Sequence, residues 1–288
     1  YHQTQNKRHK TTVDWACQMI KQVRRWLPGR TIVLVGDGAY AAVKLALCCC
    51  GLQMPVCLVS RLRLDAALYD FPPPNQPGKR GPKPKKGKKQ TPLLTQIKDT
   101  STQWTSIVID WYDGIKREVE IFSGISLWYT PGQSPVPIKW VVVRDPEGKL
   151  RTEAFFATDL NASVQQILHW FVLRWNIETT FEEMRAHLGL ETQRQWSDLA
   201  IARTTPVLFA LFSIIVLMAV ELSKSKAIKI FTCAWYKKTD ATFSDIIAFV
   251  RRHIWYARNL TKSSHAHDSS YFQNDLLESM LHIVCYAT

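Results

Sequence analysis

An aspartate between two glycines is the first residue of this chain whose position could serve chemistry. Asp37 follows the short apolar run 31–35, and Gly36 and Gly38 flank it. A run of aliphatic, mostly β-branched residues predicts a buried strand, and ligands of open α/β sheets bind at the carboxyl ends of such strands. The Asp37 carboxylate could therefore bind a divalent cation. An aspartate at this place also caps the following helix very often, so the residues alone leave both roles open.

A second group of charged side chains lies on one predicted helix, residues 161–188. Phe171, Arg174, Glu178 and Arg185 occupy positions i, i+3, i+7 and i+14. These offsets fall within about one face of an α-helix. A carboxylate between two guanidinium groups suits a metal ion and a phosphate, because the carboxylate ligates the cation and the arginines grip phosphate oxygens. A ladder of surface salt bridges is the alternative, since charged helix faces usually form one.

Four short elements near the start of the chain must position Asp37. The residue pattern predicts a helix over 12–27, a strand over 31–35, a helix over 39–50 and a strand over 55–60. Strand, helix and strand with short connections form a βαβ unit, whose two strands are parallel. We therefore predict that residues 12–61 form the first half of an α/β core.

The next block, residues 62–158, has the alternating pattern of an all-β insertion. Strands are predicted at residues 105–110, 117–122, 125–129, 138–144 and 153–158. The front end of this block, residues 72–92, contains three consecutive prolines and a run rich in glycine, proline and lysine. Such a composition cannot build a core, so it predicts a disordered loop.

That loop carries seven basic residues and no acidic one between positions 78 and 89. They are Lys79, Arg80, Lys83, Lys85, Lys86, Lys88 and Lys89. The whole chain of 288 residues has a formal net charge of +13. An excess of this sign favours an extended polyanion as the partner. We expect the seven side chains to be exposed and to contact a DNA backbone without sequence preference.

The apolar and cysteine content bounds the class of protein. Hydrophobic residues make up 46% and charged residues 21% of the chain, which excludes disorder as a whole. The seven cysteines are an odd number and no two of them are spaced as C-x-x-C. A reduced interior is therefore expected in place of a disulfide framework or a zinc knuckle.

Helices are predicted for the last part of the chain. Residues 159–222 are expected to hold core helices, and residues 223–288 a helical C-terminal region with a polar tail. The apolar run 206–220 has fifteen residues without a charge. A bilayer span takes about 20 residues and a buried core helix is often shorter. A core helix is thus the favoured interpretation of this run, and a membrane span is the alternative.

The two candidate motifs together resemble those of a known family, over residues 31–196. The sequence G-D-G-A-Y at 36–40, with R-W-N-I-E-x-x-F-x-x-x-R-x-x-L-G-L at 174–190, is similar to the second aspartate and the glutamate of cut-and-paste DDE transposases from bacterial insertion sequences. That family carries Tyr, Arg, Glu and Lys at this helix spacing, and an all-β insertion between the second Asp and the Glu. Here Phe171 replaces the tyrosine and Arg185 the lysine.

The resemblance implies a fold and an activity. The implied fold is a ribonuclease-H-like α/β core, incomplete at the N-terminus, with an all-β insertion and a helical C-terminal part. The implied activity is that of a DNA transposase, which hydrolyses and transfers DNA strands at the ends of a mobile element. Asp37 and Glu178 would be catalytic ligands of Mg²⁺, with Mn²⁺ as a substitute. Phe171, Arg174 and Arg185 would contact DNA phosphates.

The resemblance also implies partners and a location. The partner is double-stranded DNA, as terminal inverted repeats and as target, and the protein is expected to act as a homodimer on that DNA. No membrane partner is expected. The implied location is the bacterial cytoplasm, in association with the nucleoid.

The first catalytic aspartate of the family has no evident counterpart in this chain. It lies on the first strand of the ribonuclease-H-like sheet, whereas only Asp14 precedes Asp37 here. Asp14 stands at the head of a predicted helix, where a negative charge interacts favourably with the helix dipole. We therefore expect the first aspartate and the first three strands to precede Tyr1, and this chain alone to be inactive in DNA cleavage.

Other interpretations stay open. One alternative is a non-catalytic DNA-binding remnant that uses the basic loop and the arginine-rich helix, and another is a membrane-associated protein with a span near 206–222. Turns or caps are expected for the carboxylates of Asp110, Asp113, Asp145 and Asp159. A polar tail is a simpler interpretation than a metal site for His265, His267 and Asp268. Sheet packing or stacking on an unpaired base is open to Trp104, Trp111, Trp128 and Trp140.

Overall fold

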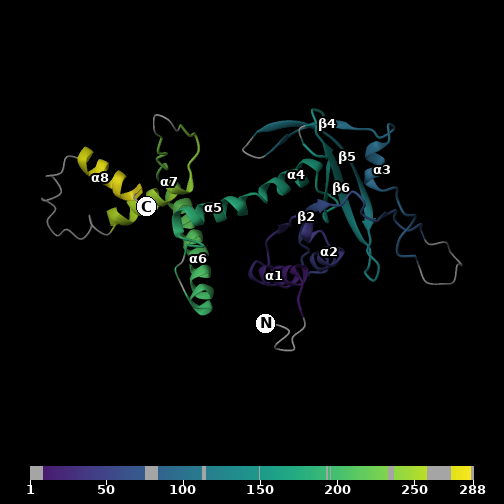
Figure 1. The fold of residues 1–288 in the computed structure, drawn as a ribbon, viewed down its shortest axis with the longest axis horizontal. Helices are drawn as coiled ribbons and strands as arrows, with labels where there is room; N and C mark the ends of the chain where they lie inside the picture. The colour runs from purple at the N-terminus through teal and green to yellow at the C-terminus, as the bar shows by residue number, and fades with distance from the viewer. Residues whose placement is uncertain are drawn as a thin grey trace. The chain divides into compact units, whose positions relative to one another are not determined.

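The computed structural model describes residues 9–74, 84–111, 115–148, 150–192, 194, 196–232, 237–257 and 274–286. The chain divides into two compact units, Tyr1–Trp175 and Asn176–Thr288, and each is described by itself (Figure 1). The first unit contains the β-sheet, and the described part of the second is helical.

The sheet of the first unit has seven strands in the order β1-β2-β7-β6-β5-β3, and β4 pairs with β5. The strands are β1 Val33–Val35, β2 Cys57–Leu62, β3 Leu68–Tyr69, β4 Thr105–Asp110, β5 Lys116–Trp128, β6 Val136–Arg144 and β7 Glu153–Ala157. β1 and β2 are parallel, and the other pairings between these described strands are antiparallel. The sheet is therefore mixed, as in a ribonuclease-H-like core, and the predicted α/β fold class is confirmed.

The predicted βαβ unit is present. It consists of β1, the short helix η1 Gly38–Tyr40, the helix α2 Val43–Cys50 and β2, with Val33 opposite Cys57. The helix α1 Thr12–Trp26 precedes it and begins with a capping box between Thr11 and Asp14. A hydrogen bond from Lys44, together with those from Thr11, holds the pKa of Asp14 well below its ordinary value. The predicted helix-terminal role of Asp14 is thereby confirmed.

The predicted insertion continues the core sheet. β7 pairs antiparallel with β2, with Val59 opposite Ala157, so the boundary predicted at residue 62 falls within one sheet. The two strands predicted at 117–122 and 125–129 are a single strand, β5. Gly124 lies within this strand, and the indole ring of Trp140 on β6 covers it. A Cβ atom at this position would come within 2.7 Å of that ring, so the glycine makes room for the tryptophan. The helix α3 Leu93–Lys98 was not predicted.

Helices cover both faces of the sheet. Leu58 of β2 and Phe156 of β7 pack on the side of α1 and α2, in one apolar cluster. The residues next to them, Val59 and Phe155, pack on the other side against the helix α4 Val164–Leu173. Alternate residues of a strand point to opposite faces, so this pattern places the sheet between two helical layers.

The helix predicted over 161–188 is two helices, and this prediction was wrong. α4 begins with a capping box at Ser163 and ends at Leu173, and α5 Asn176–Leu188 follows after a turn at Arg174 and Trp175. α4 is strongly apolar and buries three side chains, whereas only Met184 of α5 is buried. The two helices have different packing partners, so the chain breaks where the sheet-covering face ends, which is also the boundary between the two units.

The second unit contains α5, α6 Asp198–Ser223, α7 Phe243–Trp255 and α8 Asn274–Tyr286. α7 packs against both α6 and α8. The helices predicted at 199–222 and 242–257 are confirmed within two residues at each end. The predicted polar tail at 261–270 lies outside the described residues.

The long helix α6 is not a buried core helix within its own unit. It has 26 residues, its most apolar stretch has a mean hydropathy of 2.3, and 6% of that stretch is buried in the described structure. By length and composition the helix could cross a membrane. One such helix is only weak evidence for a membrane protein. The favoured interpretation as a core helix was therefore wrong for the described part of this unit.

A buried carboxylate joins the helices of the second unit. Asp245 of α7 is 0% exposed and accepts hydrogen bonds from the Phe231 N–H at 3.0 Å and the Thr242 N–H at 2.9 Å. It also forms an ion pair with Lys238 and accepts a hydrogen bond from the Tyr286 hydroxyl of α8 at 2.9 Å. This network holds α8 and the segment before α7 against the carboxylate of Asp245 on α7.

Candidate active site

Asp37 lies at the carboxyl end of β1, and its side chain is exposed. One carboxylate oxygen accepts a hydrogen bond from the Ala39 N–H at 2.9 Å, so Asp37 caps η1. Its carbonyl oxygen accepts from the Ser60 hydroxyl of β2 at 2.7 Å, which fixes the turn to the neighbouring strand. Gly36 is required here because a Cβ atom would lie 2.9 Å from that of Tyr40. The cap role, one of the two that the sequence left open, is present, and the same carboxylate faces solvent at the sheet edge.

An arginine that the sequence did not single out lies beside this turn. Arg61 is on β2, and its Cβ atom lies 3.9 Å from the place where Gly38 would carry one. Its guanidinium carbon is 5.6 Å from the ring centroid of Phe171, and it pairs with Glu153 at 3.3 Å. One feature of the sequence could have pointed to Arg61. It is a charged residue near the carboxyl end of a mostly apolar strand, and that strand pairs with the one that precedes Asp37.

Phe171 belongs to the core and not to the surface. It is 1% exposed and its ring centroid is 4.6 Å from that of Phe155. A side chain buried in this way cannot reach DNA, so the predicted contact between Phe171 and phosphate was wrong. Its ring instead supports two cations, because the guanidinium carbon of Arg174 also lies 5.6 Å from its centroid. The first unit therefore brings Arg61 and Arg174 to one aromatic ring, next to the turn that carries Asp37.

Glu178 and Arg185 belong to the second unit. Glu178 is exposed in the first turn of α5. Arg185 is exposed and forms a two-point ion pair with Glu191, with N···O distances of 2.6 and 3.2 Å. This contact raises the pKa of Arg185 and lowers that of Glu191. Because Asp37 and Glu178 lie in different units, their convergence on one metal ion stays a prediction.

Comparison with protein families reports two matches. Residues 1–118 match the family described as DDE superfamily endonuclease, and residues 128–231 match that described as archaeal putative transposase ISC1217. Together, the two matches support a DDE transposase. No curated protein matches it. The predicted resemblance is thus confirmed, whereas the bacterial host and the truncation stay predictions.

Two of the other candidate carboxylates, Asp145 and Asp159, have local partners. Asp145 accepts hydrogen bonds from the N–H groups of Glu147 and Leu150, and Asp159 accepts one from the Asn161 N–H. These are the predicted turn roles. Among the described residues, no group of three or more His, Cys, Asp and Glu side chains could hold a metal ion. Asp113, His265, His267 and Asp268 lie outside the described part of the chain, and Asp110 is exposed at the end of β4.

The tryptophans of the sheet pack in its core. Trp128 is 7% and Trp140 is 6% exposed. The ring centroid of Trp104 is 4.8 Å from that of Phe122, and Trp111 packs against the second apolar cluster. Sheet packing, one of the two roles left open by the sequence, is the one that the structure supports.

The six described cysteines form no disulfide. Burial raises the pKa of Cys17 to about 11 and that of Cys49 to about 12. Both thiols are therefore protonated at neutral pH, and a protonated thiol is neither a good nucleophile nor a metal ligand.

The described end of the basic loop has a defined backbone. The Gly87 N–H donates to the Asp70 carbonyl at 2.8 Å, the Asp70 N–H donates to the Lys88 carbonyl at 2.9 Å, and Lys89 forms a β-bridge with Tyr69. The predicted disorder was therefore wrong for residues 84–92. Exposed side chains are found, as predicted, for Lys85, Lys88 and Lys89, whereas Lys86 is half-buried. Lys79, Arg80 and Lys83 lie outside the described residues.

Removing the charges of the basic run is expected to flatten the salt dependence of DNA binding. Each lost phosphate contact should lower the slope of log affinity against log salt by about 0.9, because fewer counterions are released. The measurement is a fluorescence-polarisation titration of duplex DNA at several salt concentrations, with the seven residues changed to alanine. The matched control changes the six lysines to arginine, which keeps the charge. An unchanged slope in the alanine variant would make the run a spacer.

Proposed function

We propose that this chain carries the core of a metal-dependent DNA transposase that cuts a mobile element at its ends and transfers it into target DNA. One observation carries the proposal. Arg61 and Arg174, from distant parts of a DDE-family chain, lie over the same Phe171 ring beside the turn of Asp37. Two cations at the carboxyl edge of a parallel strand pair are suited to hold a phosphate next to a catalytic carboxylate.

The metal would be Mg²⁺, with Mn²⁺ as a substitute, and its proposed ligands are Asp37 and Glu178. The donor set fits, because both side chains are exposed carboxylates and hard cations take oxygen ligands. Asp37 uses one of its two oxygens for the cap of η1, within the described structure. When bound, the metal activates the attacking oxygen and stabilises the leaving one.

The side chains of the chain itself would position the DNA. Arg61 and Arg174 would each hold phosphate oxygens, with the buried ring of Phe171 keeping the two guanidinium groups at fixed places. Arg185 of α5 would add a third phosphate contact. For this it would release its ion pair with Glu191 and bind a DNA phosphate instead. The Ala39 N–H orients the carboxylate of Asp37 through its hydrogen bond.

The third carboxylate of the reaction is not assigned to a residue of this chain. Asp14 is committed to its capping box and to Lys44. We therefore propose that the 288-residue chain does not cleave DNA by itself. The proposed partners are terminal inverted repeats and target DNA, bound by a homodimer in the bacterial cytoplasm at the nucleoid, without a membrane partner.

Replacing either arginine at the Phe171 ring tests the proposal. Arg61→Ala and Arg174→Ala are each expected to lower the affinity for duplex DNA by about tenfold, since each removes a charged hydrogen bond to phosphate. The control is Arg25→Ala. Arg25 is an exposed arginine in the last turn of α1, which precedes β1, whereas the Asp37 turn follows β1. The measurement is fluorescence polarisation with the folded variants. Equal affinities of all three variants and the unchanged protein would contradict the phosphate role.

A further inference from the structure

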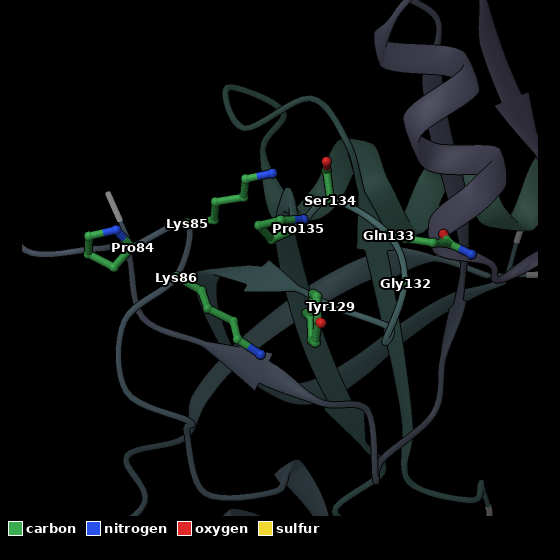
Figure 2. A pocket seen from close by; sticks show the side chains of 8 residues that line it. All are labelled: Pro84, Lys85, Lys86, Tyr129, Gly132, Gln133, Ser134 and Pro135. Atoms are coloured by element: carbon green, nitrogen blue, oxygen red, sulfur yellow. The ribbon is translucent and has the colours of Figure 1, made fainter. Parts of the chain in front are cut away.

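A pocket of about 600 Å³ lies in the first unit where β5 turns into β6, away from the strand end that carries Asp37. Figure 2 shows its walls, which include Pro84, Lys85, Lys86, Tyr129, Ser134 and Pro135. None of the lining residues that the structure describes is acidic. A pocket of this size is within the range that holds small ligands or single groups of a larger one, and its charge favours an anion.

Lys86 supplies a positive charge, and no carboxylate stands among the described residues that line this pocket. Its ammonium nitrogen lies 3.9 Å from the ring centroid of Tyr69 and 3.4 Å from that of Tyr129. The two rings are themselves in edge contact, with centroids 5.7 Å apart. A cation–π contact holds a cation in place through the quadrupole of a neutral ring. The charge is thus fixed in position while its field still acts on a ligand.

The wall that carries the two lysines is tied to the sheet. Gln90 donates to Asp70 at 2.7 Å and accepts from the Ser126 hydroxyl at 2.7 Å. Ser126 in turn accepts from the buried Trp140 indole N–H at 2.8 Å. A chain of hydrogen bonds therefore runs from the core to the backbone next to the lysines. A binding site held in this way loses little entropy when a ligand arrives.

Lys85, Gln133 and Ser134 are further polar side chains that line the pocket. In Figure 2 the Lys85 ammonium extends toward the wall that carries Pro135 and Ser134. Lys85 and Ser134 are both exposed. An ammonium group and a hydroxyl are both donors, whereas the proline and tyrosine rings offer apolar surface. This combination suits an anionic group that is attached to a non-polar ring.

We infer that this pocket binds one phosphodiester group of a DNA strand, with Lys85 and Ser134 donating to its oxygens and the adjoining deoxyribose against the proline and tyrosine rings. The inference rests on the proposed function, because that function supplies DNA as the partner. It adds a second, built phosphate site to the one at Arg61 and Arg174. The basic run then binds DNA through a fixed pocket and not only through diffuse charge.

A substitution without a change of charge separates a built site from diffuse attraction. Ser134→Ala is expected to lower the affinity for duplex DNA by about tenfold, since a hydrogen bond to a charged group is lost. Ser123→Ala on β5 is the control, because Ser123 is also exposed and does not line the pocket. Lys85→Ala should cause a similar loss, and the double variant should lose less than the two single losses combined, since both residues hold one phosphate.

The outcomes distinguish this site from the proposed function. If the unchanged protein binds DNA and Ser134→Ala equals Ser123→Ala, the pocket site is overturned while DNA binding stands. If the unchanged protein binds no DNA, the proposed function fails and this inference with it. Calorimetry with inorganic phosphate tests the other source of the same group. Weaker phosphate binding by Ser134→Ala with unchanged DNA affinity would assign the pocket to free phosphate and overturn the DNA site.

Discussion

Asp37→Asn and Glu178→Gln are each expected to weaken Mn²⁺ binding by about 100-fold. Groups that only orient metal ligands already cost about 10–100-fold when they are changed, so the loss of a direct ligand should cost at least as much. The double variant should lose less affinity for Mn²⁺ than the two single losses combined, because both carboxylates ligate one ion. Calorimetry and the electron-paramagnetic-resonance signal of free Mn²⁺ measure these affinities.

Metal binding is the right readout because it requires the two carboxylates to meet. Shared ligation needs their oxygens within roughly 4–6 Å, given metal–oxygen distances near 2.0–2.6 Å. Asparagine is also a good cap, so Asp37→Asn keeps the local fold of η1 while it removes the charge. The two variants therefore probe ligation and not stability.

Asp159→Asn is the matched control for the metal experiment. Like Asp37, Asp159 is an exposed aspartate that accepts a backbone hydrogen bond in a turn. The preceding residue, Thr158, donates its N–H to the carbonyl of Leu58, near the start of β2. Asp159 therefore lies at the opposite end of the strands from Asp37. Equal Mn²⁺ affinity in all three variants would contradict the shared site and favour the non-catalytic DNA-binding alternative. Mg²⁺-dependent nicking by the unchanged chain would instead assign the third carboxylate to Asp14, Asp110 or Asp113.

Asp245→Ala is expected to destabilise the second unit by about 3–5 kcal/mol, because it leaves the charge of Lys238 buried without its partner. Lys238 is 11% exposed at its side chain, so water compensates only in part. α8 should open first, since the Tyr286 hydroxyl then loses its acceptor. Hydrogen exchange of the amides in α7 and α8, followed by mass spectrometry, measures the free energy of this opening.

Two further variants keep the prediction for Asp245 testable if the alanine variant does not fold. Tyr286→Phe removes one hydrogen bond to the carboxylate and should cost about 1.5–3 kcal/mol. Asp240→Asn changes an exposed aspartate before α7 and should have no effect on exchange. Equal protection of α8 in Tyr286→Phe and Asp240→Asn would contradict the role of the network.

The stability contributed by Asp245 depends on pH in one direction. Burial by itself would raise the pKa of Asp245, but the hydrogen bonds from Lys238, Phe231, Thr242 and Tyr286 outweigh burial and lower it. A carboxyl with a lowered pKa in the folded state stabilises the fold above its unfolded-state pKa. This contribution should be lost as the pH falls below the ordinary aspartate value of 3.8. In Asp245→Ala the same acid range should show a smaller loss of protection.

The sequence by itself determined the elements whose signals are local. The run 31–35 predicted β1, and residues 12–61 predicted the βαβ unit. These features depend on short-range periodicity, which neighbours in the chain decide. The resemblance to DDE transposases followed from the same local spacing, and the family matches support it.

Packing decided what local spacing could not. The spacing placed Phe171 and Arg174 on the same helix face as Glu178, but Phe171 packs against Phe155 in the core, and α4 ends at Leu173, before Glu178. Arg61 became a candidate only because the fold brings β2 against α4. These are contacts between residues far apart in the chain, and no window of sequence contains both partners.

The predictions for the basic loop and for the apolar helix α6 were wrong for a related reason. Composition predicted disorder for residues 84–92, yet Tyr69 and Tyr129 hold Lys86 and the backbone pairs with Asp70. Composition also predicted burial for the run 206–220, yet most of α6 is exposed within its own unit. Whether a segment is held or buried depends on the surfaces that surround it, and those surfaces exist only once the strands and helices have come together.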